Sequence, residues 1–160
     1  MNIFILSRDP KAAARMQCDK HVVKMILEST QMLSTAHHIC GTIHNLSDLY
    51  RPAYANHPCT RWARQTSGNY QWLLRHAQEL SREYSRRYRK VHKSDQLING
   101  VLQHNPCPVG RRTAFAQAMP DQYKVKGDSV KAYRDYYRLE KTKAFVMTWT
   151  TPRSVPRFIK

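Results

Sequence analysis

The stretch DKHVVKMILE, residues 19–28, decides the fold, because its apolar residues recur at the spacing of an α-helix. On such a helix Val22 and Ile26 fall on one side, and we expect Val23 and Leu27 to lie beside them. Charged residues occupy a different side. The stretch therefore predicts an amphipathic helix, and the other segments are interpreted from it outward.

The charged side of this helix carries a candidate chemical group. Lys20, Lys24 and Glu28 lie at i, i+4 and i+8, with His21 adjacent, so one carboxylate stands one turn beyond two amines. A lone acid among cations stays ionised and lies near any phosphate that the cations attract. The simpler interpretation is that Lys24 and Glu28 form an ordinary surface pair, worth about 0.3 kcal/mol.

The charge of the whole chain indicates a polyanionic partner. The 160 residues include 27 Lys and Arg against 11 Asp and Glu, a formal net charge of +16. No apolar run approaches the roughly 20 residues of a membrane span. DNA, RNA or a nucleotide is therefore the expected partner, with DNA first, and a membrane is not expected.

The four cysteines are widely spaced, at Cys18, Cys40, Cys59 and Cys107. No Cys-x-x-Cys occurs, and the neighbouring Cys/His pairs lack the double-knuckle spacing of structural zinc sites. The chain also shows no signal peptide. We therefore expect free thiols in a reducing cytoplasm, with no metal and no cofactor.

Start and stop signals predict about five helices in one mainly α, compact helical bundle that spans residues 1–160. The expected starts are Asp9-Pro10, Asp19, Pro58, Ser67, Ser94 and Asp128. The first segment either runs into the Asp19 helix or breaks near Cys18, and Gly41 is the expected stop of that helix.

Other segments are expected to be irregular or short. Residues 3–6 form either one short N-terminal strand or a buried extended segment. Residues 114–119 begin like a helical turn that Pro120 breaks. Residues 142–160 are expected to form an extended C-terminal tail packed on the helices.

Basic and aromatic residues supply the candidates for nucleic-acid contact. Residues 56–64 place His57 at a helix cap with Arg61 and Trp62 on the next turn, a set that suits a phosphate and a base. The alternative is a capping histidine with a core tryptophan, and the basic face of the 67–90 helix is alternatively only solvated. The candidates are His21, His57, Arg61, Trp62, Arg64, Tyr70, Arg82, Arg86, His92, Lys93, Arg111, Arg112 and Lys124.

Several of these motifs resemble a family of small bacteriophage-encoded proteins that open Met-Asn-Ile-Phe. The matching stretches are residues 19–25, 56–64, 69–73, 88–93 and 115–124. Members of that family are mostly uncharacterised, and some are likened to the phage pyrimidine-dimer DNA glycosylases. The resemblance implies a DNA-acting protein in the cytoplasm of the bacterial host.

Dimer glycosylases of this type are compact helical proteins that extrude a base and use a glutamate on an early helix with an N-terminal amine as nucleophile. The resemblance places Glu28 at the glutamate, with Lys20, Lys24 and Arg61 as cations near a phosphate or base. It also implies that Trp62 or Trp72 stacks the extruded base.

The identity of the nucleophile stays open at the level of sequence. Asn2 is bulky for a residue exposed by removal of Met1, so Lys20 or Lys24 is an alternative imine-forming amine. The candidate catalytic residues are therefore Glu28, Lys24 and Lys20.

Three classes of function remain open. The first is an enzyme on DNA bases, most simply an N-glycosylase with abasic lyase activity, or as a variant a base-modifying transferase. The second is a non-catalytic phage protein that binds DNA or sequesters a nucleotide signal of the host. The third is a structural or host-interaction protein.

Overall fold

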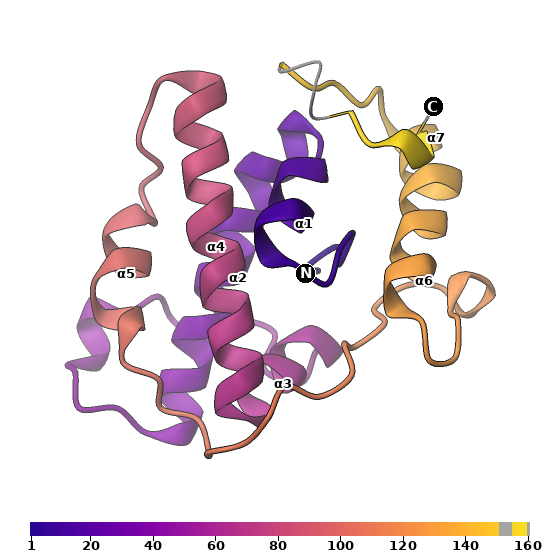
Figure 1. Ribbon diagram of the computed structural model, residues 1–160. Helices are drawn as coiled ribbons and strands as arrows, with labels where there is room; N and C mark the ends of the chain where they lie inside the picture. Colours follow the sequence, from indigo (N-terminus) through magenta and orange to yellow (C-terminus); the bar gives the residue numbers. More distant parts are fainter. Residues whose placement is uncertain (151–154, 160) are drawn as a thin grey trace.

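Two 22-residue helices, α2 (Asp19–Cys40) and α4 (Ser67–Tyr88), form the centre of the fold (Figure 1). The computed structural model describes residues 1–150 and 155–159. The shorter helices α1 (Pro10–Met16) and α3 (Pro58–Gln65) pack on this pair. The predicted mainly α fold class is confirmed.

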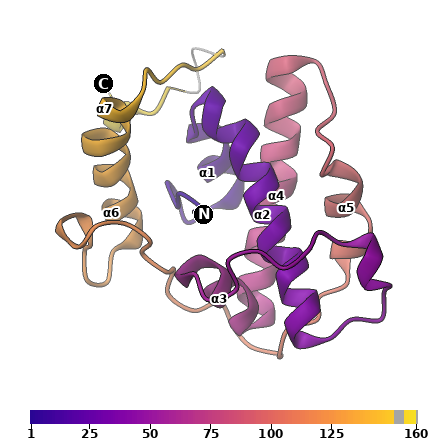
Figure 2. The same ribbon diagram turned by 180° about the vertical axis from the view of Figure 1, so that it is seen from behind.

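The remaining helices lie at opposite edges of this centre. Helix α5 (Asp95–Asn99) packs on α4. Helix α6 (Ser129–Tyr136) continues through a π-helical turn, Tyr137–Lys141, into α7 (Thr142–Ala144). This C-terminal arm stands beside the N-terminal segment, on the far side from α5 in both views (Figures 1 and 2). Short 3-10 turns complete the described elements: Leu46–Asp48, Val101–Gln103, Asp121–Tyr123 and Arg157–Ile159.

The helix boundaries follow the sequence signals. Asp9 caps α1 by accepting a hydrogen bond from the Ala12 N–H at 2.7 Å, and Gly41 ends α2 with a φ of 93°. The chain breaks between α1 and α2 at Gln17 and Cys18, which resolves that alternative. Helix α5 ends at Asn99, because the backbone turns at Gly100 and Leu102 lies in a 3-10 turn.

The apolar side of α2 faces the neighbouring helices as expected for Val22 and Ile26, which are fully buried. Val23 and Leu27 are 37% and 40% exposed, so the prediction that they pack beside the core is wrong. They lie one position further around the helix, about 100° from Val22 and Ile26, and beyond the side that the neighbouring helices cover. The buried side of α2 extends in the other direction instead, through His21, Met25 and Met32.

The N-terminal segment is the buried extended alternative and not a strand. Residues 3–6 are all buried. Side chains satisfy part of their backbone: the Gln17 amide donates to the Ile3 carbonyl at 3.0 Å and Arg134 Nε donates to the Leu6 carbonyl at 2.9 Å. No ladder of backbone hydrogen bonds is then needed, and the described residues contain no strand.

Residues 114–119 are extended, so the predicted helical turn there is wrong. Their backbone groups bond to side chains from distant elements. The Tyr133 hydroxyl donates to the Ala116 carbonyl at 2.9 Å and accepts from the Ala118 N–H at 3.1 Å, and Asn2 Nδ2 donates to the Ala118 carbonyl at 2.8 Å. These bonds replace those of a helix.

The start of the C-terminal tail is helical over Thr142–Ala144, whereas residues 145–150 are irregular and return to α2. Trp149 Nε1 donates to the Met16 carbonyl at 3.1 Å, and the Thr150 N–H and hydroxyl both donate to Asp19 at 3.1 Å. Residues 151–154 and 160 of the predicted tail lie outside the described residues.

A buried ion network ties α4 to the start of α2. The Arg87 side chain is fully buried and donates to Asp19 Oδ1 at 3.0 Å and to the Gln17 and Arg15 carbonyls at 2.9 and 3.1 Å. It also pairs with Glu83 Oε2 at 3.3 Å. Removing one partner from such a buried ion network leaves an uncompensated charge in the interior and strongly destabilises the fold.

Two further properties bear on the sequence predictions. All four cysteines are free thiols. Among the described residues, no helix has the length and apolar character needed to cross a membrane.

Candidate active site

Glu28 turns inward from α2 toward the first residues of the chain. Its Oε2 accepts a hydrogen bond from the backbone N–H of Asn2 at 2.8 Å and lies 4.0 Å from the α-amine of Met1. Its Oε1 lies 3.5 Å from Nζ of Lys24. The Glu28 side chain is only 11% exposed against 63% for Lys24, so it is not an ordinary surface acid.

The Asn2 side chain fixes the position of the nitrogen that faces Glu28. Its Oδ1 accepts from the N–H groups of Ile3 and Phe4, and its Nδ2 donates to Ala118. Phe4 has a φ of 54°, a left-handed conformation that a bulky residue adopts only where the surroundings hold it. The start of the chain is thus held rigidly against the carboxylate.

A small cavity of about 270 Å³ opens at this point. It brings together one carboxylate, an α-amine, two lysine amines and an imidazole. Its lining residues are Met1, Asn2, Phe4, His21, Lys24, Met25, Glu28, Ala118, Tyr136 and Lys141. The positive charge around a single carboxylate makes it suited to an anionic substrate.

His21 lines the cavity with a buried imidazole. Its ring stacks on Phe4 with the centroids 4.4 Å apart, and Nδ1 lies 2.9 Å from the Tyr137 hydroxyl. That hydroxyl also accepts the Cys18 N–H at 2.9 Å, so Tyr137 links His21 to the start of α2. Burial, with the nearby lysines, lowers the pKa of His21 to about 3.

His57 caps α3 close to the same cavity. Its Nδ1 accepts from the Cys59 N–H at 3.2 Å. Burial and the charge of the N-terminal amine lower the pKa of His57, while Glu28 acts in the opposite direction. The predicted cap is confirmed, and it brings the start of α3 near the Glu28 carboxylate.

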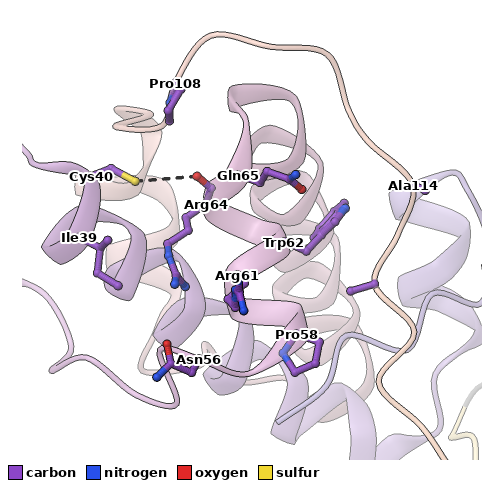
Figure 3. Close-up of a pocket in the computed structure, with 11 residues that line it drawn as sticks. Ile39, Cys40, Asn56, Pro58, Arg61, Trp62, Arg64, Gln65, Pro108 and Ala114 are labelled. Atoms are coloured by element: carbon purple, nitrogen blue, oxygen red, sulfur yellow. Dashed lines mark hydrogen bonds between the residues drawn. The ribbon is translucent and has the colours of Figure 1, made fainter. Parts of the chain in front are cut away.

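A larger hollow of about 690 Å³ lies between α3 and the segment 108–116 (Figure 3). Asn56, Arg61, Arg64 and Gln65 line it. Arg61 is exposed, while Arg64 is anchored by a bond from Nη1 to the Ala55 carbonyl at 2.6 Å. The hollow therefore combines guanidinium and amide groups.

The tryptophans do not offer a face to an extruded base. Trp62 and Trp72 are only 5% and 7% exposed. Trp62 points toward the segment that carries Ala114 (Figure 3) and packs against Phe115, with ring centroids 5.3 Å apart. Trp72 Nε1 donates to the Arg8 carbonyl at 2.8 Å. Both rings complete the core, which corrects the predicted base stacking.

Tyr70 is a second correction. It is fully buried, and its hydroxyl donates to the Leu102 carbonyl at 2.9 Å and lies 2.9 Å from Nε2 of His37. Tyr70 lies on the buried side of α4, where its ring packs in the core and its hydroxyl finds buried partners. Tyr70 therefore packs in the core and is not presented to DNA.

The other predicted contacts divide between the site and more distant surfaces. Lys20 lies beside Lys24 on α2, with its Nζ 4.5 Å from the Phe145 ring centroid, and does not line the cavity. Several predicted contacts also lie outside the cavity lining: Arg82, Arg86, His92, Lys93, Arg111, Arg112 and Lys124. Of these, three face acids: Arg82 pairs with Glu79, Arg86 with Glu83, and Lys124 with Asp121.

Sequence reasoning missed two cavity residues, Tyr136 and Lys141. They lie on the C-terminal arm, more than a hundred residues from Glu28 in the chain. The apolar stripe of residues 130–137 indicated a helix there but not its neighbour. Only the packing of α6 beside residues 1–6 brings them to the carboxylate.

The fold and the site together define a class: a helical protein in which a buried glutamate holds the amine end of the chain within a basic cavity. A profile of the pyrimidine dimer DNA glycosylase family matches residues 1–97. The chain therefore belongs to that family. No curated protein and no solved structure matches the chain. The matched region contains Glu28, His21 and Arg61 but not Tyr136 or Lys141.

Proposed function

We propose that this protein is a phage DNA N-glycosylase with abasic lyase activity, acting in repair or modification of phage DNA. The observation that carries the proposal is the 2.8 Å hydrogen bond between the Asn2 nitrogen and Glu28. Family membership supports DNA as the substrate, and the net charge of +16 favours the same partner.

In the proposed reaction an uncharged amine attacks C1′ of the target nucleotide, and the bond from C1′ to the base breaks as the base leaves with the bonding electrons and takes up a proton from water. Glu28 takes a proton from the amine and stabilises the positive charge that develops on the sugar. The bond from C1′ to the ring oxygen then breaks, Glu28 returns its proton to that oxygen, and C1′ is joined to the amine as a protonated imine. Removal of a C2′ proton expels the 3′ phosphate and cleaves the strand.

Two amines are candidates for the attack. If Met1 is removed, the Asn2 nitrogen becomes the α-amine and already lies against Glu28; if Met1 stays, its own amine lies 4.0 Å away. Lys24, at 3.5 Å, is the alternative nucleophile. We assign Lys20, which lies outside the cavity, to phosphate contact.

The proposed DNA surface extends from the cavity across α3. His21 lines the cavity, His57 caps the start of α3, and Arg61 and Arg64 line the hollow beside α3. Arg111 and Arg112 are exposed on the loop that follows Pro108. These residues would position the strand by its phosphates, which fixes register without reading sequence.

Borohydride trapping on an abasic duplex tests the proposal. The protein should form a covalent adduct, and Glu28→Gln should lower turnover at least 100-fold while leaving duplex affinity within about twofold, since the carboxylate acts on the reacting sugar. Mass spectrometry of the trapped peptide identifies the amine. Glu79→Gln, a matched acid on α4, is the control and should behave as wild type.

Two results would contradict the glycosylase and lyase proposal. One is the absence of any adduct or base release on dimer-containing, abasic and phage-modified duplexes. The other is a Glu28→Gln protein that turns over as fast as wild type.

The hollow beside α3 favours a second candidate, a non-catalytic protein that sequesters a nucleotide. At about 690 Å³, with Arg61, Arg64 and two amide side chains, it suits a nucleotide. Titration calorimetry with mononucleotides and cyclic nucleotides would then show binding that depends on Arg61 and only weakly on salt. Duplex binding would fall steeply with salt instead.

A further inference from the structure

A second basic cleft lies at the other side of α6 from the Glu28 cavity. It has a volume of about 760 Å³ and is formed by α1, the end of α4, α6 and residues 155–158. Five cations line it: Lys11, Arg15, Arg86, Arg134 and Arg157. Only Arg86 was a candidate from the sequence. The other four cations lie on α1, on α6 and in residues 155–158, which are far apart in the chain.

The charge of this cleft is only partly balanced. Asp9 is the one acid among its described lining residues, and its carboxylate is used in capping α1. Arg15 and Arg86 share Glu83. Within residues 1–150 and 155–159, the other three cations have no carboxylate within 4.0 Å. The cleft therefore holds an excess of positive charge.

The cleft and the cavity are separate sites. Arg134 and Tyr136 are two positions apart on α6, which places them about 200° apart around the helix. Tyr136 lines the Glu28 cavity and Arg134 lines the cleft. The N-terminal segment lies between the two sites: Phe4 faces the cavity, while the Leu6 carbonyl accepts from Arg134. A ligand in one site leaves the other open.

We propose that this cleft binds the sugar–phosphate backbone of a second nucleic-acid segment while the Glu28 cavity is occupied. Duplex DNA carries one charge per roughly 1.7 Å of its axis, so a concave set of cations meets several phosphates at once. Guanidinium groups bind phosphate oxygens through paired hydrogen bonds, and four of the five cations are arginines on separate elements. The inference rests on the proposed function only for the identity of the first segment.

The experiment uses two duplexes with different fluorophores. The full-length protein is first trapped with borohydride on a labelled abasic duplex, which fills the cavity covalently. An undamaged duplex of the second colour is then titrated, and energy transfer reports its binding. We expect a second duplex to bind with strong salt dependence.

The double variant Lys11→Gln/Arg157→Gln tests whether the cleft is responsible. Loss of two phosphate contacts should reduce the slope of log affinity against log salt by about 1.8, so the gain in second-duplex affinity from 200 to 50 mM salt falls by about 12-fold. Arg51→Gln/Lys126→Gln removes the same charge from exposed positions outside the cleft and should leave the second duplex bound as in wild type.

The possible outcomes separate this inference from the catalytic proposal. If no adduct forms, the glycosylase proposal fails, and the cleft is still tested by bridging of two undamaged duplexes of different colours. The inference is overturned if each protein binds only one duplex. It is also overturned if both double variants lose the same amount of second-duplex affinity. Binding of inorganic tripolyphosphate through Lys11 and Arg157 without a second duplex also overturns it, and assigns the cleft to a free polyphosphate.

Discussion

Lowering the pH from 7 to 5 should reduce the free energy of unfolding by about 6 kcal/mol, because three buried histidines, His21, His37 and His76, gain a proton only when the chain unfolds. His76 is fully buried, and its Nδ1 lies 3.0 Å from the Pro10 carbonyl, so that nitrogen donates. Its Nε2 then accepts from the Gln17 amide at 3.1 Å. His21 is kept neutral by burial and by the nearby charges of Lys141, Lys24 and Lys20.

The magnitude follows from the pKa values. Burial lowers the pKa values of His76 and His37 to about 4 and that of His21 to about 3, against about 6.5 in the unfolded chain. Because the folded pKa is the lower one, the unfolded state binds more protons between these values and stability falls as pH falls through 6.5. Each histidine contributes about 2 kcal/mol of loss by pH 5.

Urea unfolding at pH 7 and pH 5, followed by circular dichroism, measures this loss. His76→Gln should be less stable than wild type at pH 7 but should show a pH dependence smaller by about 2 kcal/mol, since one titrating group is gone. His38→Gln, a change at a half-buried histidine with an exposed edge, is the comparison. Equal unfolding free energies of wild type at the two pH values would refute the assignment of neutral buried imidazoles.

Three further predictions concern the ion network and the amine. Arg87→Met should lower the free energy of unfolding by about 3–5 kcal/mol, because Asp19 and Glu83 lose a buried partner, whereas the exposed change Arg75→Met should have little effect in the same melts. Burial raises the pKa of Asp19, but hydrogen bonds from Thr150 and Thr148 and from Arg87 outweigh it and hold that pKa below its usual value. The stability that Asp19 contributes is therefore present above about pH 4 and is lost as the pH falls below that value. In the Asp19→Asn variant the free energy of unfolding should depend less on pH in that range. An uncleavable Gly-Ser extension before Met1 should abolish borohydride trapping if the α-amine attacks, and the same extension after Lys160 should not; an unchanged yield with the N-terminal extension would move the role to Lys24.

Helix starts were readable from the sequence because capping is local. Asp9 caps α1 and His57 caps α3 through bonds to N–H groups two or three residues away, so short motifs contain both partners. The side of α2 that carries Glu28 was predicted from the spacing of apolar residues along that helix, which is also a short-range property. The sequence could thus indicate that Glu28 stands beside cations on an early helix.

Burial of the aromatic residues could not be predicted with the same success. Trp62 and Trp72 lie on helices whose basic neighbours suggested a nucleic-acid surface, yet Phe115 packs against both rings. That contact spans more than forty residues of chain and leaves no periodic signal. Exposure is decided by the elements that cover a face, and a helical pattern contains only its own face.

The sequence by itself determined the helical class, the basic character and the amphipathic helix that carries Glu28, since composition and helical period are local properties. Only the tertiary structure decided what Glu28 does there. It set the Asn2 nitrogen against the carboxylate, placed Tyr136 and Lys141 across the cavity, and put Arg134 into a separate cleft. These arrangements depend on contacts between residues more than twenty positions apart, which packing fixes and no short motif can encode.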